Sequence, residues 1–75
     1  MKLLVFGSLA ETTGKTELDV KGIATTDLLK EKIFSMYPQL ANHTFLIAVN
    51  KKVQTANVRL DENDVVALMP PFAGG

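Results

Sequence analysis

The chain has 75 residues, with eight basic side chains balanced by eight acidic ones, and it contains no cysteine. This length predicts one small domain spanning residues 1–75, and the hydrophobic content of 47% predicts a packed core rather than a disordered chain. Balanced charge without a basic stripe argues against nucleic-acid binding, and no apolar stretch is long enough for a membrane span. Without cysteine, the chain cannot form a disulfide framework or supply a thiol nucleophile. The expected setting is the cytoplasm, with neither nucleic acid nor membrane as a partner.

The N-terminal residues predict two strands separated by a helical turn. Residues 2–7 are apolar on both faces, which is typical of a central strand. Residues 8–14 predict one short helical turn that stops at Gly14. Residues 16–20 alternate polar and apolar side chains, as in a half-buried strand. Their closeness to the first strand favours an antiparallel hairpin with an elaborated loop.

The only long helix predicted by the sequence starts after Thr25. A threonine cap followed by Asp27 in the first turn is typical of a helix N-terminus. The apolar residues that follow at helical spacing predict one buried stripe, formed by Leu29, Ile33, Met36 and Leu40. Pro38 ends or sharply bends this helix, so Leu40 belongs either to the helix or to its exit turn.

Three further strands are predicted in the second half of the chain, at residues 45–49, 53–54 and 65–69. A turn at residues 50–52 joins the first two, and a polar turn at residues 61–64 precedes the last. Pro70 cannot donate a ladder hydrogen bond, so the last strand ends before it.

This element order predicts an α+β fold of the ubiquitin-like β-grasp type, a mixed sheet of about five strands packed on one main helix. The first and last strands, which are apolar on both faces, should lie side by side and parallel in the middle. A ferredoxin-like fold is the alternative, but it needs a second full helix.

A single helix covers only one face of such a sheet. In the first strand, Leu4 and Phe6 lie on the face opposite Leu3 and Val5. Some of these apolar side chains must therefore be exposed unless a partner covers them or they close a small core.

The last residues, 70–75, form an uncharged arm that ends in two glycines. Pro70 and Pro71 stiffen the base of this arm, and Gly74 and Gly75 make its tip thin enough to enter a narrow channel. Its extended reach is roughly 20 Å. These properties suit a terminus delivered into the active site of another protein, although a frayed tail without function has the same composition.

Other candidate residues point to no chemistry. His43 is the lone histidine and is expected to be an ordinary surface residue. Ser8 and Ser35 lack the sequence context of an activated nucleophile. The acids at positions 61, 62 and 64 fit a solvated turn better than a calcium loop, so no metal site is expected.

The turn at residues 61–64, the strand at 65–69 and the ending Pro70-Pro71-Phe72-Ala73-Gly74-Gly75 together resemble the small, sulfur-carrying subunits of molybdopterin synthase. These form the MoaD family within the ThiS/MoaD group of ubiquitin-like β-grasp proteins. Residues 2–7 and 48–50 resemble the opening strand and a middle strand-to-turn segment of that family. The diglycine is shared by all ubiquitin-like sulfur carriers, whereas the prolines four residues ahead of it are the discriminating feature.

The resemblance implies a carrier that is not catalytic alone and binds no cofactor. An E1-like, zinc-bearing enzyme would adenylate the Gly75 carboxylate with ATP, and a sulfur donor protein would convert it to a thiocarboxylate. The arm, including Phe72, Ala73 and Gly74, would then enter the large subunit of molybdopterin synthase in a two-plus-two heterotetramer. Sulfur would pass there to cyclic pyranopterin monophosphate. By match to the family, the interface residues would be Phe6, Val53 and Met69.

Three alternatives share these features. The chain could carry sulfur for thiazole in thiamin synthesis or for tRNA thiolation. It could be a ubiquitin-like modifier that forms isopeptide bonds with lysines, or an interaction module whose arm is inert.

Overall fold

The computed structural model describes residues 1–71 and confirms the α+β β-grasp prediction. In chain order the elements are β1 (Lys2–Val5), α1 (Ser8–Thr13), β2 (Glu17–Asp19), α2 (Thr26–Met36), the 3-10 helix η1 (Pro38–Asn42), β3 (Leu46–Val49), β4 (Lys52–Gln54) and β5 (Val65–Met69). Within the described part of the chain, α2 is the one long helix, which excludes the ferredoxin-like alternative.

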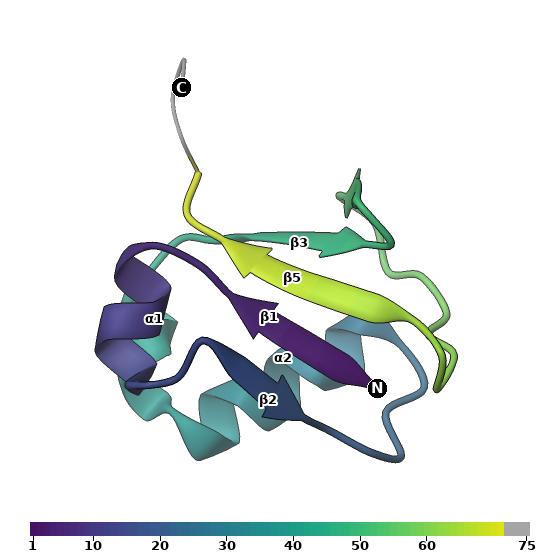
Figure 1. Ribbon diagram of the computed structural model, residues 1–75, viewed down its shortest axis with the longest axis horizontal. Coiled ribbons are helices and arrows are strands. Elements are labelled where there is room, and N and C mark those ends of the chain that lie inside the picture. The colour runs from purple at the N-terminus through teal and green to yellow at the C-terminus, as the bar shows by residue number, and fades with distance from the viewer. Residues whose placement is uncertain (72–75) are drawn as a thin grey trace.

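The five strands form one mixed sheet in the order β2-β1-β5-β3-β4 (Figure 1). Strands β1 and β5 are parallel neighbours, and all other pairs are antiparallel. The predicted parallel pairing of the first and last strands is therefore confirmed. Strand β1 ends two residues before the predicted limit, because Gly7 leaves the extended region with φ 60° and ψ −138°.

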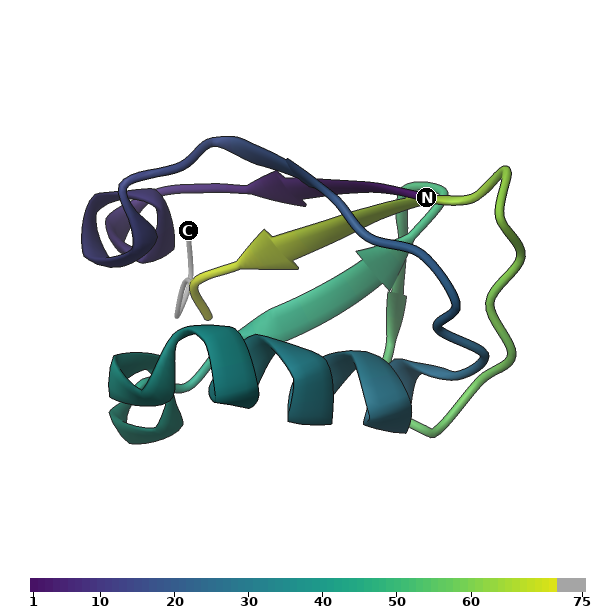
Figure 2. The same cartoon turned by 90° about the horizontal axis from the view of Figure 1, so that it is seen from below.

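Helix α2 crosses one face of the sheet and leaves the other open (Figure 2). Alternate residues of the two parallel strands point toward α2: Leu3 and Val5 in β1, and Val66 and Leu68 in β5, are all buried. The core between the layers is completed by Leu9, Val20, Leu29, Ile33, Leu40, Ile47 and Leu60.

The predicted apolar stripe of the helix is wrong at Met36, which is 38% exposed. The helix ends at this residue, and the chain turns at Pro38 into η1, whose Leu40 fills the core beyond Ile33. Phe34 and Tyr37, both partly buried, pack against the core instead. Leu40 thus belongs to the exit turn, one of the two positions that the sequence allows.

The start of α2 is fixed by two separate caps. The hydroxyl of Thr25 accepts a hydrogen bond from the backbone N–H of Leu28 at 3.3 Å, which confirms the predicted N-cap. The Asn57 side-chain carbonyl accepts a second bond, from the backbone N–H of Asp27 at 2.9 Å. The loop before β5 is thereby tied to the start of the helix.

In the connection between β1 and β2, Gly14 ends α1 with φ 74°, as the sequence predicts.

No helix among residues 1–71 has the length and apolar character needed to cross a membrane.

Candidate functional site

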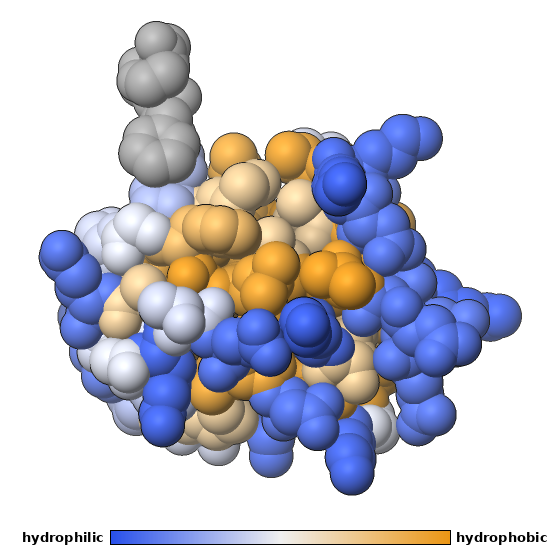
Figure 3. Space-filling view, viewed as in Figure 1, coloured by the Kyte–Doolittle hydropathy of each residue, from blue (hydrophilic) through white to orange (hydrophobic). Residues whose placement is uncertain are grey.

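The sheet face opposite α2 carries a continuous row of apolar side chains. Cross-strand partners in a sheet point to the same side, and the register places Leu4 beside Ala67, Ala67 beside Ala48, and Ala48 beside Val53. One apolar row therefore runs across four strands, and no helix among residues 1–71 covers it. Figure 3 shows this apolar band at the centre of the face, bordered by hydrophilic residues.

The centre of this face is hollowed. The hollow has a volume of about 560 Å³ and is lined by Leu4, Phe6, Ala48, Asn50, Lys51, Val65, Ala67 and Met69. Ala48 and Ala67 are direct partners on the two neighbouring strands β3 and β5. Their methyl groups rise less from the sheet than the surrounding Phe6 and Met69 side chains, so the surface is depressed between them. We refer to this set of eight residues as the hollow.

The three residues predicted for a partner interface all lie on the same side of the sheet. Phe6 is 46% exposed and Met69 is half-buried, and both line the hollow. Val53 is 50% exposed on the edge strand β4 and does not line the hollow. None of the three belongs to the buried core cluster. Their availability for a partner agrees with the prediction, while their role in binding stays a prediction.

Sequence reasoning missed Ala48, Asn50 and Lys51 as members of the hollow. The signal that could have identified them is the two-residue turn Asn50-Lys51, which sets the register of β3 against β4 with Val49 opposite Lys52. Once this register is fixed, Ala48 must share a face with Val53.

A polar cluster holds the turn of this hairpin against the start of β5. The Asn50 amide donates to the Asp64 carboxylate at 2.9 Å, and its carbonyl accepts from the backbone N–H of Val65 at 3.0 Å. The second carboxylate oxygen of Asp64 accepts from the backbone N–H of Asp61 at 2.8 Å. The predicted polar turn at 61–64 is thus a structural joint at one end of the hollow.

These hydrogen bonds to the Asp64 carboxylate make the stability of the fold dependent on pH. The backbone hydrogen bond from Asp61, followed by that from Asn50, lowers the pKa of Asp64 below its usual value of 3.8. A carboxylate with a lower pKa in the folded state stabilises the fold above the unfolded pKa, and this contribution is lost as the pH falls through the folded pKa. We therefore expect Asp64→Asn to lower the melting temperature at pH 7, and the difference from the parent chain to shrink as the pH falls below about 4.

Thermal unfolding of both chains between neutral and strongly acidic pH measures this effect. Glu62→Gln is the matched control, because it removes a charge from the same turn and the Glu62 side chain makes neither of these hydrogen bonds. Its melting temperature, plotted against pH, should therefore run parallel to that of the parent chain. A difference between Asp64→Asn and the parent chain that persists unchanged at the lowest pH would contradict the assignment to the Asp64 carboxylate.

The arm begins where β5 leaves the hollow. Met69 is the last residue of β5 and lines the hollow, Pro70 is half-buried, and Pro71 is exposed. The strand ends before Pro70, as the sequence predicts. Phe72, Ala73, Gly74 and Gly75 lie outside the described residues, so the roles assigned to them stay predictions.

The remaining candidates show no arrangement for catalysis in the described part of the chain. His43, Ser8 and Ser35 are exposed, and no group of three histidine or acidic side chains among residues 1–71 could hold a metal ion. The acids at 61 and 64 accept hydrogen bonds within their own turn, as expected for a structural role. The apolar hollow is therefore the candidate site, and an exposed apolar surface of this kind is suited to contact with another protein.

A mixed five-stranded sheet packed on one main helix places the chain in the class of small β-grasp domains. The model of the ThiS family matches residues 3–75, and the chain belongs to this family of small sulfur carriers. One curated relative, a molybdopterin synthase sulfur carrier subunit from Dictyostelium discoideum, is 28% identical and matches 99% of this chain and 94% of its own length.

Solved structures share the fold at lower identity. A putative molybdopterin converting factor subunit 1 from Pyrococcus furiosus superposes with a TM-score of 0.81 at 22% identity, covering 95% of both chains. SAMP1 from Haloferax volcanii has a TM-score of 0.78 at 24% identity, covering 100% of this chain and 98% of its own. A complex of subunits 1 and 2 of the molybdopterin-converting factor from Helicobacter pylori contains a chain with a TM-score of 0.70 at 22% identity, covering 99% of this chain and 96% of its own. At these identities the likeness concerns the fold alone.

Proposed function

We propose that the chain is the sulfur-carrier subunit of a molybdopterin synthase. The observation that carries this proposal is that β5 runs along the hollow and continues directly into Pro70 and Pro71. A partner seated on the hollow would therefore lie next to the base of the arm, and the arm could reach its active site. Sulfur carriers serve several pathways, and the choice of molybdopterin synthase among them rests on the full-length similarity to the Dictyostelium subunit.

In this proposal Gly75 carries the reactive carboxylate. A carboxylate resists nucleophilic attack, and transfer of an adenylyl group from ATP, with release of pyrophosphate, gives it AMP as a leaving group. Sulfur at the sulfide oxidation level, delivered by a donor protein, attacks the acyl carbon. The carbon–sulfur bond forms as the carbon–oxygen bond to AMP breaks, and the product is a thiocarboxylate. Its sulfur forms a bond to cyclic pyranopterin monophosphate, and water then hydrolyses the bond between the acyl carbon and the sulfur, so that the terminus returns to a carboxylate. ATP is a substrate of the activating enzyme, so the carrier itself needs no cofactor.

The proposed assembly is a single domain, residues 1–75, bound to a large subunit in a two-plus-two heterotetramer in the cytoplasm. Phe6 and Met69 would contact the large subunit through the hollow, and Val53 would contact it at the edge of the sheet. The arm, from Pro70 to Gly74, would thread toward the active site. An E1-like adenylating enzyme and a sulfur donor protein complete the set of partners.

Intact mass spectrometry of the chain from its native host tests the proposal. Replacement of oxygen by sulfur adds about 16 Da to the free chain. When the chain that carries the thiocarboxylate is mixed with the large subunit and the pterin precursor, it should lose the added mass of the sulfur as molybdopterin appears. Conjugates of higher mass would identify a modifier instead. Loss of sulfur only to a thiazole or tRNA acceptor would identify a carrier for another product.

A further inference from the structure

The turn between β3 and β4 contains a lysine in a backbone conformation that lysine disfavours. Asn50 and Lys51 have φ values of 50° and 71°, and they are the only non-glycine residues with positive φ in the described chain. Two-residue hairpin turns with both φ values positive favour the dipeptide Asn-Gly, because glycine has no Cβ to clash in the left-handed region. A lysine therefore occupies the position where glycine would be unstrained.

The structure accounts for the asparagine of this turn but not for the lysine. Asn50 is held by its hydrogen bonds to Asp64 and Val65, and asparagine tolerates the left-handed region. The Lys51 side chain has no hydrogen bond or ion pair with any residue between 1 and 71. Backbone strain that no internal contact explains points to a function of the side chain outside the fold.

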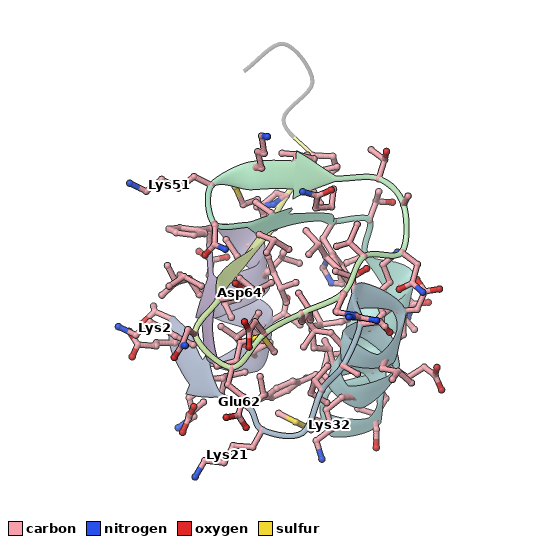
Figure 4. All side chains as sticks on the ribbon, turned by 90° about the vertical axis from the view of Figure 1, so that its right-hand side faces the viewer. Lys2, Lys21, Lys32, Lys51, Glu62 and Asp64 are labelled. Atoms are coloured by element: carbon pink, nitrogen blue, oxygen red, sulfur yellow. The ribbon has the colours of Figure 1, made fainter. Side chains whose placement is uncertain are left out.

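Lys51 lines the polar end of the hollow, beside Asn50. Figure 4 shows Lys51 and Lys2 projecting on the side of the sheet opposite α2, whereas Lys32 lies on the helix side. Lys2 is balanced by Glu17 on the neighbouring strand, with 3.9 Å between the ammonium nitrogen and the carboxylate oxygen. The open face thus combines an apolar centre with a lysine ammonium, at the turn of β3 and β4, that forms no ion pair within residues 1–71.

We infer that Lys51 is a specificity-determining residue that pairs with a carboxylate on the protein that covers the hollow. This inference rests on the proposed function and takes the large synthase subunit as that protein. An apolar hollow alone would accept many hydrophobic surfaces, and a charge at its rim fixes the orientation of the partner and speeds its association. Correct orientation matters here, because the arm must leave β5 toward the active site.

Three variants at this position separate charge from backbone conformation. Lys51→Asn removes the charge and keeps a residue that tolerates positive φ, whereas Lys51→Gly also removes the strain. Lys51→Arg retains the charge. The matched control is Lys52→Gln, which removes a neighbouring charge from β4. Lys52 is the partner of Val49, which packs against the core, so Lys52 lies on the other face.

Binding of each full-length chain to the purified large subunit is measured by calorimetry at low and high salt, together with the melting temperature of the free chain. At about 50 mM salt, Lys51→Asn and Lys51→Gly should weaken binding by about fivefold, and the difference should fall below about twofold near 500 mM because salt screens the pair. Lys51→Arg and Lys52→Gln should bind like the parent chain. Lys51→Gly should melt at the same temperature or higher, because the strain is relieved.

Equal affinity and equal salt dependence of the parent chain and Lys51→Asn would overturn the inference while leaving the proposed function intact. A clear fall in the melting temperature of Lys51→Gly would also overturn it, because Lys51 would then contribute to the fold. If the parent chain does not bind the large subunit at all, both the proposed function and the partner named here fail. Self-association of the free chain that Lys51→Asn abolishes would assign the hollow to a second copy and overturn the choice of partner.

Discussion

A chain extended by one residue beyond Gly75 is expected to lose sulfur loading and transfer by about 100-fold or more while folding normally. One added residue moves the carboxylate by about 3.5 Å. A displacement of even about 1 Å from the reacting position costs roughly 100-fold in rate. The residues of β5 that hold the core, Val66 and Leu68, precede the arm, so the extension should leave the unfolding curve unchanged.

The measurement is the fraction of thiocarboxylate formed with the activating enzyme and sulfur donor, read by intact mass. A cleavable extension provides the control, because removal of the added residue should restore loading to the same molecules. Full loading of a chain whose extension is shown by mass to remain attached would contradict the assignment of Gly75.

The positions of the strands along the chain could be predicted from the sequence because each strand depends on a local pattern. Strand β1 is apolar on both faces over Leu3, Leu4 and Val5, which indicated a position inside the sheet, and the same argument held for β5. The cap at Thr25 and the stop at Gly14 depend on single residues with strong backbone preferences. Each of these features is encoded within a few neighbouring residues.

The prediction at Met36 failed because its burial depends on where the chain goes after the helix. Helical spacing places Met36 on the apolar stripe, but η1 brings Leu40 into that part of the core and leaves Met36 at the surface. Periodicity describes a helix as if it were alone, whereas packing at the helix end is decided by the following segment.

The open face was predicted as a surplus of apolar side chains, but its hollow was not. The depression arises where Ala48 and Ala67 meet across β3 and β5. This meeting depends on strand register between residues far apart in the chain. The joint between Asn50 and Asp64 depends on the same register. Neither contact leaves a local sequence pattern, because each joins residues that lie far apart in the chain.

Replacement of Phe6 by glutamate is expected to weaken binding to the large subunit roughly 30-fold or more, with little effect on folding. A central interface anchor contributes about 2 kcal/mol or more, and a charge buried under the partner would add to this loss. Phe6 borders the hollow, is 46% exposed and lies outside the core cluster, so the free chain can solvate a glutamate there. Met69→Glu should act in the same direction.

Leu28→Glu is the matched control for this experiment. Leu28 is 45% exposed, nearly the same as Phe6, but it lies on α2 and therefore on the opposite side of the sheet. Both variants replace a large apolar side chain with one negative charge and should shift the melting temperature by similar, small amounts. Only Phe6→Glu should weaken binding in calorimetry. A melting temperature that collapses in Phe6→Glu, with the affinity of the remaining folded chain intact, would mean that Phe6 stabilises the domain and that the partner binds elsewhere.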